Sequence, residues 1–221
     1  MFTRFSGILF LIVLLSRPVN AQLSDTIKYS LQQKPKFFLT LVSFNTIIDD
    51  QYASIGGLRL GLNYNQRIRF GLGFFNLTNN AVASTIHVSE NSQDYYTLGA
   101  LNFSFVSLSA EYFFFNDYPW QCTITPIQFG FGGAKYGYVR HSDQEYVFTP
   151  SETIILYQPE ISAQYSIFRW LGVGVTTGYR ATLLRSKKYT QHLDAPLFAL
   201  DVRLFIDEIY KMLFKKEGKK E

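Results

Sequence analysis

The chain has 221 residues and a formal net charge of +4, and only 17% of its residues are charged, where a soluble protein usually carries about 25%. Aromatic residues make up another 17%, mostly Phe and Tyr. If Arg4 and Arg17 leave with an N-terminal leader, the net charge falls from +4 to +2, which does not indicate nucleic acid or a polybasic membrane contact.

Residues 1–21 have the pattern of a cleaved export signal. Arg4 supplies the positive start, residues 7–15 form a short apolar run, and Val19-Asn20-Ala21 fits small-residue cleavage. An uncleaved anchor is the alternative, but the apolar run is shorter than the roughly 20 residues that a spanning helix needs. We therefore expect export, followed by a periplasmic segment over residues 22–36.

Eight strand-like segments follow, and their connections are alternately short and long. They span about 37–46, 54–65, 95–114, 120–139, 153–167, 170–182 and 195–206, and one more begins after a tight turn near Gln66. The longer, polar connections are 77–94, 140–151 and 183–194. Short periplasmic turns and longer external loops are typical of an outer-membrane barrel.

The clearest alternation runs from Ile155 to Ile167, where residues of one apolar set alternate one for one with a mostly polar set. Strict period-two alternation predicts a strand with one apolar and one polar face. A membrane-spanning strand needs roughly 9–11 residues. We therefore predict an all-β fold, an eight-stranded antiparallel up-and-down transmembrane β-barrel over residues 37–206.

The predicted strand at about 95–114 changes its alternation between its two halves. Asn102 and Ser104 share one parity, whereas Ser107 and Glu111 take the other. A β-bulge near Phe105 would restore the phase.

Two prolines predict further irregularities. The polar parity slips between Thr125 and Gln128, next to Pro126. Pro159 lacks a backbone donor, so it requires a bulge or a locally broken ladder.

Aromatic residues gather at both ends of the predicted strands. Those near the short turns are Tyr64, Phe70, Phe114, Phe115, Trp120, Phe168 and Trp170. Those toward the long loops are Tyr95, Tyr96, Tyr136, Tyr138 and Tyr179. We interpret them as girdles at the two membrane boundaries. The alternative is the general preference of aromatic residues for strands.

The end of the chain changes to helix-like spacing. Ile209, Met212 and Leu213 group together, and lysines and glutamates alternate beyond them. We predict a short amphipathic helix or tail over residues 207–221 on the periplasmic side. A charged terminus without a role is the alternative.

The leader, together with Gly57–Leu62, Pro126–Gly132 and Trp170–Gly174, resembles the small, porin-like outer-membrane β-barrel proteins of Bacteroidota. This family has the eight-stranded architecture of OmpA and OmpX. The resemblance implies a location in the outer membrane, with its lipids and the barrel-assembly machinery as partners. One departure is that many such barrels end on an aromatic residue, whereas here sixteen residues follow Phe205.

Charged residues are expected inside this barrel. By parity they are Arg59, Arg67, Arg69, Glu111, Glu160, Arg180, Asp201 and Arg203. An eight-stranded barrel has room for side chains and a few waters but not for a solute channel. Because isolated buried charge is very costly, we predict a structural salt-bridge network. A gated narrow conduit or a binding site is the alternative.

Residues for catalysis or metal binding are sparse. His87, His141 and His192 fall in three different predicted loops, and Cys122 is the single cysteine. His87-Val88-Ser89-Glu90 resembles the His-x-Ser element of outer-membrane lipid A deacylases, but a hydrolase needs base, nucleophile and carboxylate within hydrogen-bond reach. We predict no enzyme activity, no metal and no cofactor.

The leading functional prediction is a non-catalytic structural, adhesion or partner-binding role through the external loops. A subunit of an envelope secretion or assembly machine, docking through its loops or its Lys-rich tail, is the alternative. A lipid-modifying enzyme and a soluble exported barrel of the lipocalin type are further alternatives. No nucleic-acid partner is expected.

Overall fold

The computed structural model describes residues 25–48, 50–78, 83–90, 93–184 and 193–214. The predicted signal at residues 1–21, His192 and the tail from residue 215 lie outside the described residues. The division of the exported chain at residue 36 stays a prediction.

The described chain is mostly strand. Residues 25–31 form a helical turn before the first strand. The elements are β1 (Lys36–Ile48), β2 (Gln51–Tyr64), β3 (Ile68–Leu77), β4 (Ala83–Glu90), β5 (Gln93–Asp117), β6 (Trp120–Val139), β7 (Tyr146–Phe148), β8 (Glu152–Tyr157), β9 (Glu160–Phe168), β10 (Leu171–Leu184), β11 (Ala195–Leu204) and α2 (Ile206–Phe214).

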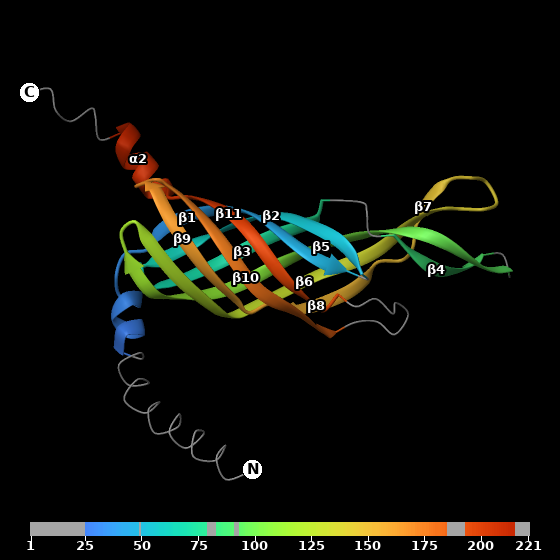
Figure 1. Cartoon of the computed structure of the whole chain (residues 1–221), viewed down its shortest axis with the longest axis horizontal. Helices are drawn as coiled ribbons and strands as arrows, with labels where there is room; N and C mark the ends of the chain where they lie inside the picture. The colour runs from blue at the N-terminus through green and yellow to red at the C-terminus, as the bar shows by residue number, and fades with distance from the viewer. Residues whose placement is uncertain (1–24, 49, 79–82, 91–92, 185–192, 215–221) are drawn as a thin grey trace, which may run out of the picture.

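The strands close into an antiparallel ring. β1 pairs with both β2 and β11, and the order continues through β3, β5 and β6. β8 and β9 each pair with β6 and with β10, so together they form one strand of the wall. The predicted eight-stranded barrel is therefore confirmed. The helix at residues 25–31 and α2 lie at the end with the short turns (Figure 1).

Two connections predicted as loops contain strands. β4 falls within 77–94 and pairs with the first part of β5, and β7 falls within 140–151 and pairs with the end of β6. Ile86 and Val88 of β4 point inward and are buried, while His87 points outward. The outward His and Ser residues made this segment look like a polar loop. These strands extend beyond the ring (Figure 1).

The β-bulge predicted near Phe105 is wrong. β5 and β6 keep an unbroken register from Ala100 to Ala110. Phe103 and Phe105 are buried on the same face as Ser107. The parity of the strand does not change there. Instead, the residues that face inward change from apolar to polar.

The two irregularities predicted at prolines are confirmed. The register between β5 and β6 shifts opposite Pro126, between the inward residues Thr125 and Gln128. The wall strand is interrupted at Gln158 and Pro159, between β8 and β9. The Gln158 backbone N–H still donates to the Gln128 carbonyl oxygen at 2.9 Å, so this break stays joined to β6.

The outer face of the barrel is apolar and exposed. Its exposed residues include Leu41, Leu60, Phe74, Leu108, Ile127, Val175, Phe198 and Leu200. Phe70, Phe114, Phe115, Trp120 and Phe168 are exposed at the end with the short turns, as the girdle prediction requires. At the other end Tyr96 and Tyr179 are exposed, but Tyr136 and Tyr138 are buried inside, so that part of the prediction is wrong.

The helix α2 follows the last strand and packs on β1. The Asp207 carboxylate accepts a hydrogen bond from the Phe37 backbone N–H at 2.7 Å, and Glu208 lies 3.5 Å from the Lys36 ammonium. A hydrogen bond from Lys211 holds the pKa of the Glu208 carboxyl below its usual value. The predicted helix-like spacing is confirmed over these residues. None of the helices in the described part of the chain is long and apolar enough to cross a membrane.

The outer face should tolerate a charged side chain only where it does not contact the hydrocarbon of the membrane, a zone that we call the lipid belt. Leu200 is 65% exposed on β11, four residues from the end of that strand, and Leu98 is 70% exposed on the extension of β5. We expect Leu200→Arg to lower the free energy of unfolding by about 2–4 kcal/mol, because the charge would enter hydrocarbon.

The matched control is Leu98→Arg, for which we expect a change below about 0.5 kcal/mol. Urea unfolding in lipid vesicles, followed by tryptophan fluorescence, measures both. Equal effects of the two substitutions would contradict a lipid belt at Leu200.

Candidate functional site

Seven of the eight charged residues predicted to face the lumen are buried in it. They are Arg59, Arg69, Glu111, Glu160, Arg180, Asp201 and Arg203. Arg67 is the exception and is exposed, so its predicted place in the lumen is wrong. The turn between β2 and β3 includes this residue, and β3 starts only at Ile68.

Arg59 is the centre of a hydrogen-bonded group that we call the lumen charge network. Its Nη1 lies 3.2 Å from Glu111 Oε1, and its Nη2 lies 3.2 Å from Glu160 Oε2. The same Nη2 donates to Gln128 Oε1 at 2.9 Å, and Gln128 Nε2 donates to Glu160 Oε1 at 2.9 Å. Arg69 Nη1 reaches the second oxygen of Glu111 at 2.8 Å. Both glutamates therefore use both carboxylate oxygens.

A second group extends the network toward β11. Arg203 donates from Nε to Thr40 Oγ1 at 3.1 Å and from Nη1 to Gln164 Oε1. Gln164 Nε2 donates to Asp201 Oδ1 at 2.6 Å, and Thr176 Oγ1 donates to Asp201 Oδ2 at 3.0 Å. Gln164 thus connects the two charged residues of β11. Six of the seven buried charged residues thus take part in hydrogen bonds or ion pairs, and the structural role of the network stays a prediction.

Two phenylalanines enclose the guanidinium of Arg69. Its Cζ lies 4.6 Å from the centroid of the Phe38 ring and 4.5 Å from that of Phe113. A desolvated cation between aromatic faces gains on the order of 2 kcal/mol. Both rings lie near the end of the barrel with the short turns.

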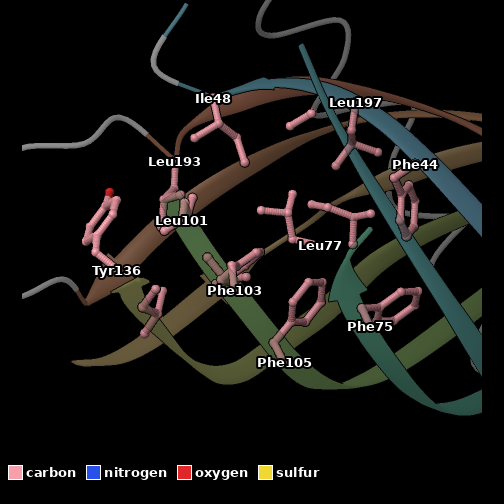
Figure 2. Packing of buried hydrophobic residues seen from close by; sticks show 14 of the residues in the cluster. Phe44, Ile48, Phe75, Leu77, Leu101, Phe103, Phe105, Tyr136, Leu193 and Leu197 are labelled. Carbon is pink, nitrogen blue, oxygen red and sulfur yellow. The ribbon is translucent and has the colours of Figure 1, made fainter. Parts of the chain in front are cut away.

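The other half of the lumen is filled by apolar side chains, which we call the plug. Figure 2 shows its aromatic and aliphatic side chains converging from opposite walls. The plug includes Phe44, Ile48, Ile55, Phe75, Leu77, Leu101, Phe103, Phe105, Tyr136, Ile154, Leu156 and Leu197. Phe75 and Phe105 stack with their ring centroids 5.0 Å apart. The lumen is therefore closed by packing on the side of the long connections.

The sequence analysis missed this plug because it expected a polar lumen along the whole strand. Ile55 has the same inward parity as Arg59, and Phe75 the same as Arg69. The available signal was a change of inward residues from charged to apolar at a similar height in several strands.

Arg180 lies in the lumen and differs from the other arginines. Its side chain is fully buried, and its Cζ lies 5.7 Å from the centroid of the Phe103 ring in the plug. None of its three guanidinium nitrogens has a hydrogen-bond partner among the described residues. The same holds for both polar side-chain atoms of Gln158.

Beyond the ring, β4 pairs with the start of β5 and β7 pairs with the end of β6, and these two hairpins join where Ala100 pairs with Gly137. We call the two hairpins together the external sheet. Its inner face includes Ile86, Val88, Tyr136 and Tyr138, which belong to the plug. Its outer face is exposed and carries His87, Tyr96, Leu98, Val139, Tyr146 and Phe148. We call these residues the aromatic face.

Close contacts order the aromatic face. The rings of His87 and Tyr96 lie 5.2 Å apart, and those of Tyr146 and Phe148 lie 5.3 Å apart, both pairs edge to face. The Lys135 ammonium lies 4.1 Å from the centroid of the Phe148 ring. Tyr146 also covers Gly137, since a Cβ at that glycine would meet the Tyr146 ring. Aromatic rings held in this way contribute large contact area at little cost in entropy.

The possible catalytic residues are on the same exposed surface. His87 and Ser89 point outward from β4, and His87 Nε2 lies 4.0 Å from Asp94 Oδ1. His141 contacts Tyr95 instead, with the ring centroids 6.2 Å apart. Within the described residues, no group of three or more His, Cys, Asp or Glu side chains is placed to hold a metal ion.

The periplasmic end of the barrel has an open cavity of about 330 Å³. Its polar and charged lining comes from Lys36, Asn63, Gln66, Asn116, Gln121, Arg169, Asp207 and Glu208. We call this cavity the vestibule.

Comparisons with known proteins identify the fold. No protein-family model and no curated protein sequence matches the chain. Among solved structures, Neisserial surface protein A matches with a TM-score of 0.55 at 12% identity, over 76% of this chain and 96% of that one. The N-terminal β-barrel domain of Pseudomonas aeruginosa OprF matches with a TM-score of 0.47 at 10% identity, over 77% of this chain and 98% of that one. Yersinia pestis Ail, solved with the heparin analogue sucrose octasulfate, matches with a TM-score of 0.45 at 11% identity, over 77% and 97%.

The chain has the fold of the small outer-membrane β-barrels. At this level of identity the likeness to Neisserial surface protein A concerns the fold alone. The apolar residues exposed on the outer face are a second, independent indication that lipid surrounds the barrel. The fold and these exposed residues together place the barrel in a bacterial outer membrane.

The lumen charge network should be sensitive to the loss of one carboxylate. Glu111→Gln would leave Arg59 and Arg69 without their shared partner, and we expect the free energy of unfolding to fall by about 3–5 kcal/mol. Urea unfolding in vesicles measures the loss.

Asp143→Asn is the matched control, because Asp143 makes a partly exposed pair with Arg140 at 3.0 Å. For that substitution we expect a change below about 1 kcal/mol. If Glu111→Gln is no more costly than the control, the network is not a structural element.

Proposed function

We propose that this protein is a non-catalytic outer-membrane barrel that binds a protein partner at the cell surface through the aromatic face of its external sheet. The single observation that carries the proposal is this exposed face, which a closed barrel supports from below. A Bacteroidota source, expected from the sequence, stays a prediction.

The height of the strands supports an extracellular position for the aromatic face. β5 has 25 residues. At about 3.3 Å per residue and a tilt of about 40°, a strand of that length rises on the order of 60 Å, whereas the apolar band of such a barrel is about 25 Å tall. The part of β5 that pairs with β4, from Gln93 to Ala100, therefore extends into the external medium.

The composition of the face is typical of a binding surface. Tyr96 is 75% exposed and Tyr146 is 58% exposed, next to the exposed Leu98. Aromatic residues dominate the energetics of protein interfaces, and contiguous exposed apolar patches mark interaction sites. The Lys135 ammonium lies against the Phe148 ring, and the Arg140–Asp143 ion pair lies beside the face, so charged groups border its apolar centre.

The closed lumen favours binding over transport. The plug fills the upper half with packed side chains, and the lumen charge network fills much of the lower half. A solute would have to displace both. The exposed position of His87 and Ser89 gives a lipid-modifying reaction no enclosed site from which water is excluded.

A subunit role in an envelope machine is the second candidate. It is favoured by the vestibule and by α2, whose Tyr210 and Leu213 are exposed at the periplasmic end. In that case the partner would crosslink from α2 and not from the external sheet.

A photo-crosslinking amino acid at position 96 tests the proposal in intact cells. We expect one adduct of defined size that approaches one partner per barrel. The matched control is position 179, where Tyr179 is exposed on β10 outside the external sheet, and no such adduct should form.

A second substitution shows whether the whole face is used. Phe148→Ser should abolish the adduct at position 96 while the heat-modifiable band of the folded barrel on gels keeps its intensity. Adducts at both positions, or an adduct that survives Phe148→Ser, would contradict the proposed surface.

The closed lumen predicts the electrical behaviour of the purified protein. In planar bilayers we expect no unitary current, because the plug leaves no continuous water path. Reproducible current steps from the wild-type barrel would show that the lumen opens and would favour a transport function.

A further inference from the structure

We propose that the lumen contains a binding site for one small monovalent anion, with chloride as the physiological occupant, between Arg180 and Gln158. The site lies at the junction of the lumen charge network and the plug. It goes beyond the surface function proposed above and does not depend on it.

The two residues face each other across neighbouring wall strands. Tyr157 pairs with Ala181, and the Tyr179 backbone N–H donates to the Pro159 carbonyl oxygen at 3.2 Å. Gln158 and Arg180 lie between these two pairs, and both side chains are fully buried.

The polar side-chain atoms of Arg180 and Gln158 make no hydrogen bonds to each other or to any other described residue. Three guanidinium nitrogens of Arg180 and both polar atoms of Gln158 lack hydrogen-bond partners among the described residues. Five unpaired polar atoms in one buried place are far more than a folded protein normally tolerates. Since each unpaired group costs about 1–3 kcal/mol, a bound group that accepts from Arg180 and from the Gln158 amide would stabilise the barrel.

The charges of the lumen do not balance. Among the described residues, four arginines are buried there, namely Arg59, Arg69, Arg180 and Arg203, against the three carboxylates of Glu111, Glu160 and Asp201. Glu160 is the carboxylate whose charge acts on Arg180, but the hydrogen bonds that its two oxygens accept come from Arg59 and Gln128 and not from Arg180. The Phe103 ring, 5.7 Å away, offers only a partial compensation. Arg180 is thus the surplus cation.

The chain supplies few further carboxylates that could reach Arg180. The strand-to-strand segments 79–82, 91–92 and 185–192, which lie outside the described residues, contain no Asp or Glu. Asp49 is the one acidic residue in such a segment. Because an isolated buried charge is very costly, a diffusible anion is the remaining partner. The group must be small, because the plug packs directly above it.

Equilibrium unfolding at constant ionic strength tests the site. The barrel is refolded into vesicles in mixtures of sodium chloride and sodium methanesulfonate. Above the dissociation constant, each tenfold rise in chloride should raise the ratio of folded to unfolded protein about tenfold if one ion is bound. A flat response would overturn the proposal.

Two variants separate the site from a general salt effect. Gln158→Glu places a carboxylate opposite Arg180, so it should fold without chloride and lose the chloride dependence. Arg180→Met removes the surplus cation, so it should also be independent of chloride and at least as stable as the wild type in methanesulfonate. Chloride dependence that persists in either variant would overturn the proposal.

Asp49→Asn tests the remaining carboxylate. If the anion is the partner of Arg180, this variant keeps the chloride dependence of the wild type. A strong loss of stability that chloride does not restore would instead identify Asp49 as the partner of Arg180 and overturn the proposal. Lys135→Met, at a half-buried position beside Phe148 and away from the lumen, serves as a control for the loss of one positive charge.

Discussion

The structure depends on the narrow lumen of an eight-stranded ring. Closing the sheet pairs the edge strands β1 and β11 and sends every second side chain into a space that bulk water does not fill. Each inward residue must then be hydrogen bonded or packed against apolar neighbours. This barrel uses both solutions in succession along its axis. The lumen charge network lies toward the periplasm, and the plug lies toward the external sheet.

The irregularities of the wall lie where these two layers meet. The shift opposite Pro126 and the break at Pro159 change the direction of neighbouring strands at one height. Gln128 follows the register shift in β6, and Glu160 follows the break between β8 and β9. Both side chains nevertheless accept hydrogen bonds from Arg59. Bulges commonly redirect side chains in this way. At the same place Arg180 has no hydrogen-bond partner among the described residues, so the geometry that completes one half of the network also leaves this cation unpaired there.

The closed lumen and the external sheet form one mechanical unit. β5 and β6 run without interruption from the periplasmic turn into the external sheet, and Tyr136 and Tyr138 connect that sheet to the plug. The aromatic face is therefore supported by a packed core and not by a loop. A rigid surface loses little entropy on binding, which favours recognition of a partner. Transport would require this same core to open.

The sequence by itself determined the fold class, the number of wall strands and, with the exception of Arg67, the charged residues that lie in the lumen. Alternation is a local property, so Arg59 and Glu160 could be assigned to the inside without knowledge of their partners. It could not separate the two inner layers, because Phe103 and Ser107 have the same parity in one strand. Only the tertiary structure decided which side chains share a height in the ring, since register and closure join residues far apart in the chain. For that reason the plug, the external sheet and the unpaired Arg180 became visible only in the folded barrel.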